Sequence, residues 1–177
     1  MFRKLLNSEL ERLSVDQFRD AEKAPLVLVL DGVRSQHNIG SAFRTCDAFR
    51  VGKICLCGIS ATPPTPEIHK AALGAEFSVA WSYFPTALEA VESLRAEGYV
   101  IVSVEQAEDA TQLQDFRPEP GRRYALVFGN EVKGVSQEVV DASDACLEIP
   151  QFGTKHSLNV SVSVGIVLWN IILNKLK

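Results

Sequence analysis

The fold of this chain is decided by residues 149–165, Ile-Pro-Gln-Phe-Gly-Thr-Lys-His-Ser-Leu-Asn-Val-Ser-Val-Ser-Val-Gly. An apolar, strand-like ending leads into a small polar loop, and polar side chains then alternate with apolar ones. The alternating polar side chains are those of Ser157, Asn159, Ser161 and Ser163. A buried polar group without a partner costs on the order of 1–3 kcal/mol. The stretch therefore predicts a polar ligand or a tightly folded backbone that pairs with these side chains.

The chain before this stretch alternates between apolar runs typical of buried strands and helical patterns. Strands are predicted at 26–30, 54–57, 78–81, 99–104, 124–128 and 145–149. Helices are predicted at 38–49, 66–74, 85–97 and 136–142, with one or two short helices within 2–21 and a loop at 106–121. This alternation predicts an α/β fold with a parallel sheet flanked by helices on both faces. Ligands of such sheets bind beyond the carboxyl ends of the strands, where Gly129 and Gln151 follow predicted strands.

The charge of the chain limits the kinds of partner it can bind. A net charge of −4 over 177 residues argues against broad, non-specific affinity for nucleic acids, which depends on clustered lysine and arginine. It leaves room for a local basic patch. The candidate patch residues are Arg34, Arg44, Arg50, Arg122, Arg123, Lys133, Lys155 and His156.

Neither a membrane segment nor a metal site is predicted. The charged start of the chain lacks the apolar run of a signal peptide, and the apolar stretch 164–173 is shorter than the roughly 20 residues of a membrane span. The four cysteines have no CxxC spacing, and the three histidines have no ligand partners at recognisable spacing. We therefore expect a cytoplasmic protein with reduced, mostly buried thiols, no membrane partner and no metal.

Two further segments belong with the first stretch. One is Asn38-Ile39-Gly40-Ser41-Ala42-Phe43-Arg44-Thr45, and the other is Leu126-Val127-Phe128-Gly129-Asn130-Glu131-Val132-Lys133-Gly134-Val135. In this order, the three segments resemble the signature motifs of the SpoU/TrmH group of RNA 2′-O-ribose methyltransferases, a branch of the SPOUT superfamily. The resemblance covers roughly residues 25–173.

The resemblance implies more about the fold than periodicity does. It implies a SPOUT-type domain at 25–177 with a C-terminal trefoil knot, preceded by a short helical extension at 1–24. The alternation between Ser157 and Ile166 predicts a strand, whereas the resemblance implies a helix over about 157–174. Knots are nearly absent from proteins, so no pattern in the sequence would predict one.

The resemblance also implies an activity, a cofactor and partners. The implied reaction transfers a methyl group from S-adenosylmethionine to a ribose 2′-hydroxyl in RNA, with tRNA as the expected substrate. The alternatives are a ribosomal RNA 2′-O-methyltransferase, an inactive RNA-binding module of the same fold, and an unrelated α/β nucleotide-binding enzyme. The first predicted strand is not followed by the glycine-rich GxGxxG motif, which argues against the last of these. The sequence identifies neither the RNA nor the nucleotide.

Four residues fall on the family's catalytic positions, namely Arg44, Asn38, Glu131 and Asn159. Arg44 would act as the base or as a positive charge near the developing alkoxide. The second role is favoured because a guanidinium is a poor base. A surface ion pair of Arg44 with Asp47 or Glu131 is the plain structural alternative. Asn38 would cap its helix and orient Arg44, and Glu131 would hold Arg44 or an asparagine side chain.

The resemblance places the cofactor against five residues, mostly through their backbone: Val104, Gly129, Ile149, Ser157 and Leu158. Replacement of Gly129 by valine is expected to block the cofactor while the fold survives. The chain departs from many relatives in the loop before Ser157, where Lys155 and His156 replace a frequent arginine.

The C-terminal helix carries more large apolar residues than one buried stripe needs. They are Val164, Ile166, Val167, Trp169, Ile171 and Ile172. The resemblance implies a homodimer that packs this helix and the helix of Asn38 across a two-fold axis, with RNA contacting both subunits.

Overall fold

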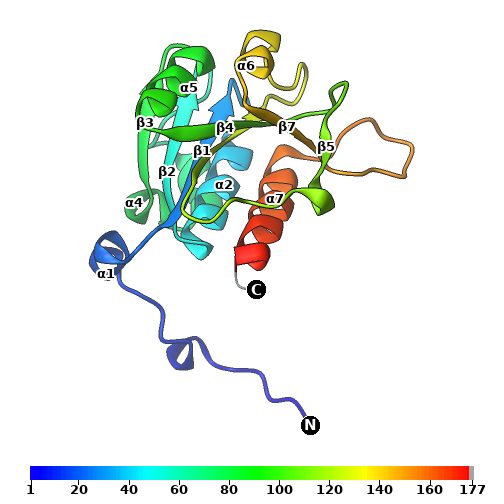
Figure 1. Cartoon of the computed structure of the whole chain (residues 1–177). Helices are drawn as coiled ribbons and strands as arrows, with labels where there is room; N and C mark the ends of the chain where they lie inside the picture. Colours follow the sequence, from blue (N-terminus) through cyan, green and yellow to red (C-terminus); the bar gives the residue numbers. More distant parts are fainter. Residues whose placement is uncertain (176–177) are drawn as a thin grey trace.

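A computed structural model describes residues 1–175, and its centre is a seven-stranded sheet of order β3-β2-β1-β6-β4-β7-β5 (Figure 1). The strands are β1 (Ala24–Asp31), β2 (Val51–Cys57), β3 (Ala80–Phe84), β4 (Tyr99–Val104), β5 (Thr111–Gln112), β6 (Arg123–Gly129) and β7 (Ala145–Glu148). Every neighbouring pair is parallel. The predicted parallel α/β sheet is confirmed.

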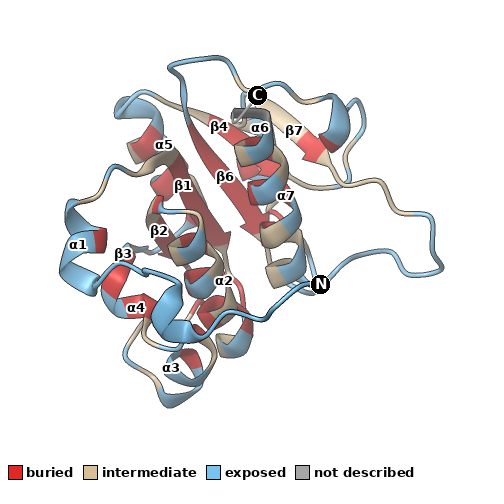
Figure 2. Cartoon of the chain, turned by 90° about the horizontal axis from the view of Figure 1, so that it is seen from below, coloured by how far each residue is buried: buried red, intermediate tan, exposed pale blue. Residues whose placement is uncertain are grey.

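Helices cover both faces of the sheet, as predicted. They are α1 (Val15–Asp20), α2 (Gln36–Ala48), α3 (Pro66–Ala72), α4 (Ala75–Ser78), α5 (Ala87–Ala96), α6 (Gln137–Asp141) and α7 (Val160–Lys175), with 3-10 turns η1 (Asn7–Glu9) and η2 (Leu113–Asp115). Alternate residues of β1 point to opposite faces. Leu28 and Leu30 pack with α2, α3 and α7, whereas Val27 and Val29 pack with α5 and α6. The central strands are therefore buried on both sides (Figure 2).

The predicted elements differ from the structure at several places, and β2 begins at Val51, three residues before the predicted strand at 54–57. The strand expected at 78–81 begins later, because Gly74, with φ of +93°, starts the short helix α4 and β3 follows it at Ala80. The loop expected at 106–121 contains β5 and η2. The helix expected over 157–174 begins at Val160. Its valines alternate along the sequence, yet Val164, Val167, Leu168 and Ile171 form one buried helical stripe.

The N-terminal extension leaves the body of the protein (Figure 1). Its two short helical segments are η1 and α1, and the Ser14–Gln17 capping box closes the start of α1. Phe18 is its buried anchor. Among the described residues, no helix is long and apolar enough to cross a membrane. The division at residue 24 and the trefoil knot stay predictions.

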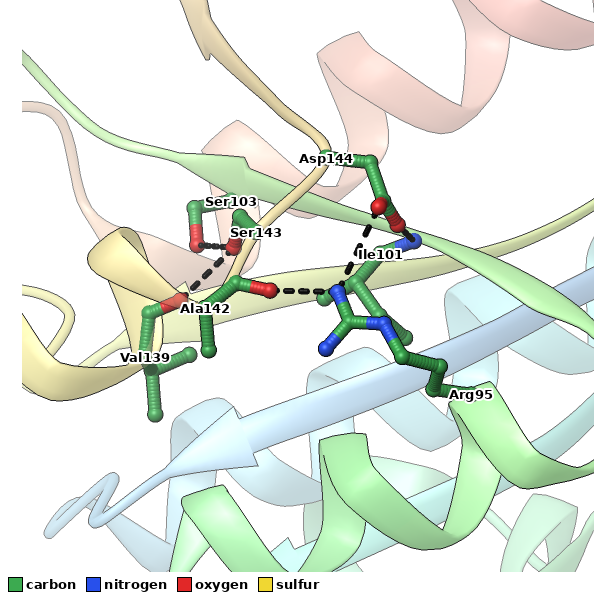
Figure 3. A network of polar contacts seen from close by, with 7 residues as sticks. All are labelled: Arg95, Ile101, Ser103, Val139, Ala142, Ser143 and Asp144. Atoms are coloured by element: carbon green, nitrogen blue, oxygen red, sulfur yellow. Dashed lines mark hydrogen bonds and ion pairs between the residues drawn. The ribbon is translucent and has the colours of Figure 1, made fainter.

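A polar network fixes the position of β7, which leads into the decisive stretch (Figure 3). The Asp144 carboxylate accepts hydrogen bonds from the Ile101 backbone N–H at 2.7 Å and from the Arg95 guanidinium at 3.4 Å. The fully buried Ser103 hydroxyl lies 2.7 Å from that of Ser143, which donates to the Val139 carbonyl. The turn between α6 and β7 is thus held to β4 and α5.

Gly40 sets how closely α2 approaches α3. A Cβ there would lie 2.5 Å from the carbonyl oxygen of Ile68 and 2.7 Å from the Cβ of Ala71. A glycine inside a helix normally costs about 1 kcal/mol relative to alanine. A glycine at position 40 lets the two helices come into contact through its bare backbone.

We therefore expect Gly40→Ala to lower the free energy of unfolding by about 1–3 kcal/mol, because the clash forces α2 away from α3. The matched control is Gly165→Ala in α7, where an added Cβ meets nothing within 4 Å. That change should raise stability by up to about 1 kcal/mol. Urea unfolding measures both variants. Equal effects of the same sign would contradict this account of the α2–α3 contact.

Candidate functional site

A cavity of about 530 Å³ lies where the loops after β4, β6 and β7 meet the start of α7. This is the carboxyl edge of the parallel strands, at which ligands of such sheets bind. Its volume falls within the roughly 300–1,000 Å³ of small-molecule sites. The ionisable side chains on its walls are Glu105, Glu131, Lys133 and His156.

All five residues predicted to hold a cofactor line this cavity. Val104 ends β4, Gly129 ends β6, Ile149 follows β7, and Ser157 and Leu158 precede α7. Segments far apart in the sequence are therefore brought to one wall. The role of the five residues as cofactor ligands stays a prediction.

The loop after β6 is a tight turn built around Asn130. The Asn130 backbone N–H donates to the Gly134 carbonyl at 3.2 Å, and the Gly134 N–H donates back at 3.0 Å. The Asn130 side-chain oxygen accepts from the backbone N–H groups of Val132 and Lys133 at 2.9 and 2.8 Å. We call residues 130–135 the Asn130 turn. Its internal bonds hold Glu131 at the cavity.

The protein's own backbone leaves no room for a side chain at Gly129. An added Cβ would lie 1.8 Å from the Gly134 carbonyl carbon and 2.0 Å from the Val135 nitrogen. The structure therefore contradicts the expectation that valine at position 129 would spare the fold. Valine would displace the Asn130 turn before it reached any ligand.

Three of the four candidate catalytic residues form one chain of hydrogen bonds. The Asn38 side-chain nitrogen donates to Glu131 Oε1 at 2.9 Å, and the Asn159 side-chain nitrogen donates to Asn38 Oδ1 at 3.1 Å. Glu131 also accepts from the backbone N–H groups of Arg34 and Ser35 at 3.1 and 3.2 Å. This chain joins the loop after β6 to the starts of α2 and α7.

The two asparagines differ in how they serve their helices. Asn38 does not cap α2, as had been expected; Ser35 is the N-cap, and its hydroxyl accepts from the Asn38 backbone N–H at 3.2 Å. Asn159 caps α7, because its side-chain oxygen accepts from the Ser161 backbone N–H at 2.9 Å and from the Ser161 hydroxyl at 2.7 Å. The Asn38 side chain is thereby left to face Glu131 and Asn159.

Arg44 lies apart from this chain of hydrogen bonds. It is exposed on α2, is not part of the cavity wall, and has no hydrogen bond or ion pair with any residue that the structure describes. It pairs with neither Asp47 nor Glu131; Asp47 accepts from the Ser78 hydroxyl, and Glu131 accepts from Asn38. Glu131 was expected to hold either Arg44 or an asparagine, and in the structure it accepts a hydrogen bond from Asn38.

Sequence reasoning missed Asp31, Glu105 and Gln106. The Asp31 carboxylate accepts from the Ser136 backbone N–H at 2.8 Å, and Glu105 accepts from the Val135 N–H at 2.8 Å. Both acidic residues stand at the carboxyl end of a buried strand, and that position was the available signal. Together they hold the end of the Asn130 turn.

Metal and thiol chemistry have little support among the described residues. They contain no group of three or more His, Cys, Asp or Glu side chains placed to hold a metal. The cysteines are free, and burial raises the pKa of the Cys46, Cys55, Cys57 and Cys146 thiols. Higher pKa values leave these thiols protonated and weakly nucleophilic.

The environment of Glu131 lowers the pKa of its carboxyl group. Desolvation alone would raise the pKa of its carboxyl, but hydrogen bonds from backbone N–H groups and from Asn38 outweigh it and lower the pKa below 4.5. A group with a depressed folded-state pKa stabilises the fold above its unfolded pKa, and that contribution disappears as the pH falls through the folded value.

We therefore expect Glu131→Gln to reduce stability by a constant amount above about pH 5. The gap between the wild type and the variant should close as the pH falls below the ordinary pKa of 4.5. Urea unfolding between about pH 3 and 7 measures it. A gap that widened with acid would contradict a carboxylate stabilised by these bonds. Glu138→Gln, at an exposed carboxylate on α6, is the control.

Comparison with known proteins adds to this geometry. Residues 25–169 match the profile of the SpoU rRNA Methylase family. The tRNA (guanosine(18)-2′-O)-methyltransferase of Thermus thermophilus is 29% identical over 171 residues, which are 96% of this chain and 86% of that protein. A Staphylococcus saprophyticus protein assigned to the TrmH family of tRNA/rRNA methyltransferases is 31% identical over 89% of this chain. The chain spans 62% of the length of that relative.

Solved structures of similar proteins share the fold. An AdoMet-bound rRNA methyltransferase from Sinorhizobium meliloti has a TM-score of 0.78 and 27% identity, over 86% of this chain and 58% of that one. The A. aeolicus TrmH/SpoU tRNA modifying enzyme has a TM-score of 0.77 and 25% identity, over 88% and 79%. The parallel sheet with helices on both faces is the arrangement of this group of proteins.

Proposed function

Because this chain belongs to the SpoU rRNA Methylase family, we propose that it transfers a methyl group from S-adenosylmethionine to a ribose 2′-hydroxyl in RNA. The observation that carries the proposal is the junction of three motif segments at one cavity. Glu131 and Asn159 line the cavity, and Asn38, which lies behind them on α2, is hydrogen-bonded to both. tRNA is the proposed substrate, since the Thermus relative that acts on tRNA is matched over 86% of its length.

The cavity fits a cofactor of this kind. Its size suits a nucleoside-bearing ligand, and Val104, Gly129, Ile149 and Leu158 line it. Bound S-adenosylmethionine would supply an electrophilic methyl group on a sulfonium that is its own leaving group. The chain must then orient the ribose and stabilise the negative charge that develops on its 2′-oxygen.

Arg44 is the residue proposed to stabilise that charge. A guanidinium is a planar donor that stays protonated, so it suits an alkoxide and a neighbouring phosphate better than it suits proton abstraction. Arg44 lies outside the cavity of its own chain, so in this proposal it acts on a ribose bound at the cavity of another molecule. A second copy of the chain is the proposed source.

The exposed face of α7 supports a homodimer. On α7, which packs against α2, apolar side chains stand in solvent, with Val162 50% and Trp169 54% exposed. Ile166 and Leu173 continue the same stripe. Contiguous exposed apolar surface of this kind marks interaction sites. Packing of α2 and α7 across a two-fold axis would cover the stripe and carry Arg44 to the partner's cavity.

The activity itself is tested with labelled S-adenosylmethionine and transcripts of tRNA and ribosomal RNA. We expect methylation of tRNA at a ribose 2′-oxygen. Arg44→Ala should lose about 10²–10³ in rate, whereas Arg44→Lys should retain part of the activity because it keeps the charge. Arg50→Ala, at an exposed arginine just after α2, is the control. Wild-type activity in Arg44→Ala would remove Arg44 from the mechanism, and no transfer to any RNA would favour the inactive RNA-binding module.

The dimer is tested by complementation. Arg44→Ala subunits are mixed with Asn159→Ala subunits, each inactive alone. If Arg44 serves the partner's cavity, half of the dimers are mixed and each of them has one intact site, so about a quarter of the wild-type activity returns. Mixed dimers that form but stay inactive would place Arg44 in its own subunit's site. A monomer by sedimentation would contradict the dimer.

A further inference from the structure

Two adjacent side chains after β4 contact both loops that wall the cavity. Glu105 Oε2 accepts from the Val135 backbone N–H in the Asn130 turn at 2.8 Å. The Gln106 side-chain nitrogen donates to the His156 carbonyl at 2.6 Å, in the loop between β7 and α7. Figure 1 shows this loop in orange, projecting beside β5. Glu105 and Gln106 therefore bridge two loops that are not adjacent in the sequence.

Glu105 is itself firmly held. Its backbone N–H donates to the Leu147 carbonyl of β7 at 3.0 Å, and its Oε1 accepts from the Gln106 backbone N–H at 2.8 Å. The half-buried side chain thus has one oxygen fixed locally and the other directed at the Asn130 turn. A carboxylate is required for both bonds, because it offers two acceptor oxygens and no competing donor.

Gly134 is fitted to this carboxylate. Its φ of +69° is a conformation that other residues rarely adopt, and a Cβ there would lie 2.1 Å from Glu105 Oε2. The absence of a side chain at 134 lets the carboxylate reach the Val135 N–H. The contact is therefore a built feature of the turn and its strand.

The turn that Glu105 holds also carries Glu131. Movement of the Asn130 turn would displace the Glu131 carboxylate from Asn38, and Asn38 in turn orients Asn159. A shift of about 1 Å in such a site can cost 10²-fold in rate. The effect of Glu105 thus extends to residues that it does not touch.

We propose that Glu105 and Gln106 are positioning residues that set the separation of the two cavity walls, and with it the affinity for S-adenosylmethionine. The identity of the ligand rests on the proposed function; the contacts do not. A site whose walls are fixed before binding loses less conformational freedom when the ligand enters. The two residues act through the Val135 N–H and the His156 carbonyl.

The variants keep side-chain size and change one bonding group. Gln106→Glu has no N–H to give to the His156 carbonyl, and Glu105→Gln has one acceptor oxygen where two N–H groups need one each. The controls are Glu108→Gln and Gln114→Glu, whose exposed side chains have no hydrogen bond to any residue in the described part of the chain. Glu108→Gln changes the charge as Glu105→Gln does, and Gln114→Glu changes it as Gln106→Glu does.

Calorimetry should give a dissociation constant for S-adenosylmethionine that is roughly tenfold higher in each variant than in its control. In methyl transfer, KM for the cofactor should rise and kcat should fall as well, because the Asn130 turn also carries Glu131. A role limited to global stability would instead lower the fraction folded and leave KM unchanged. Equal affinity in variants and controls would overturn the proposal.

Hydrogen exchange on the ligand-free protein tests the contacts independently of the cofactor. Glu105→Gln should speed exchange at Val135 and its neighbours in the Asn130 turn, and Gln106→Glu should speed it in residues 151–159. Unchanged exchange in both loops would overturn the positioning role. If wild-type protein failed to bind S-adenosylmethionine while exchange changed as expected, the proposed function would fail and the positioning of the walls would stand.

Discussion

The arrangement of this site depends on the bonds that the Glu131 carboxylate accepts. The Glu131 carboxylate connects the loop after β6 to the start of α2. It sits at the amino end of α2, where it accepts from the backbone N–H groups of Arg34 and Ser35. A helix amino terminus carries partial positive charge and unpaired N–H groups, and both favour an anion there. The local structure of α2 thus supplies the anchor for a turn almost a hundred residues away, since Arg34 and Glu131 are separated by 97 positions.

The same carboxylate gives the chain of asparagines its direction. Ionised Glu131 can only accept, so Asn38 must present its nitrogen to it and turn its oxygen to Asn159. Asn159 must then donate its nitrogen, which leaves its oxygen for the N–H and hydroxyl of Ser161. Each amide orientation follows from the one before it. The side chains of Asn159, Ser161 and Ser163 thus find partners within their own segment, and Asn159 also bonds to Asn38 in the segment at 38–45.

Sequence patterns predicted the strands that are buried on both faces of the sheet. β1, β4 and β6 are central strands with continuous apolar runs, and their predicted places agree with the structure. β3 is an edge strand that is mostly exposed, so its sequence has no apolar run to mark it, and it was expected two residues too early. The valines before Gly165 alternate in sequence but form a helix, since Asn159 satisfies the first turn and tertiary packing selects one helical stripe. Periodicity alone was wrong there, and the family resemblance was needed.

The site residues were predictable to a different degree. The motif residues were found because their order resembles a family, whereas Glu105 and Gln106 lie outside those motifs and were found from contacts alone. The acidic residues of the cavity wall affect the electrostatics of the site as well as its geometry. Both carboxylates on the cavity wall, Glu105 and Glu131, are engaged by N–H donors, so their charge is compensated within the protein. The side chains of Lys133 and His156 line the same walls. The two carboxylates of the cavity wall therefore hold its loops, and their N–H donors reduce the negative potential that the wall presents to an anionic ligand.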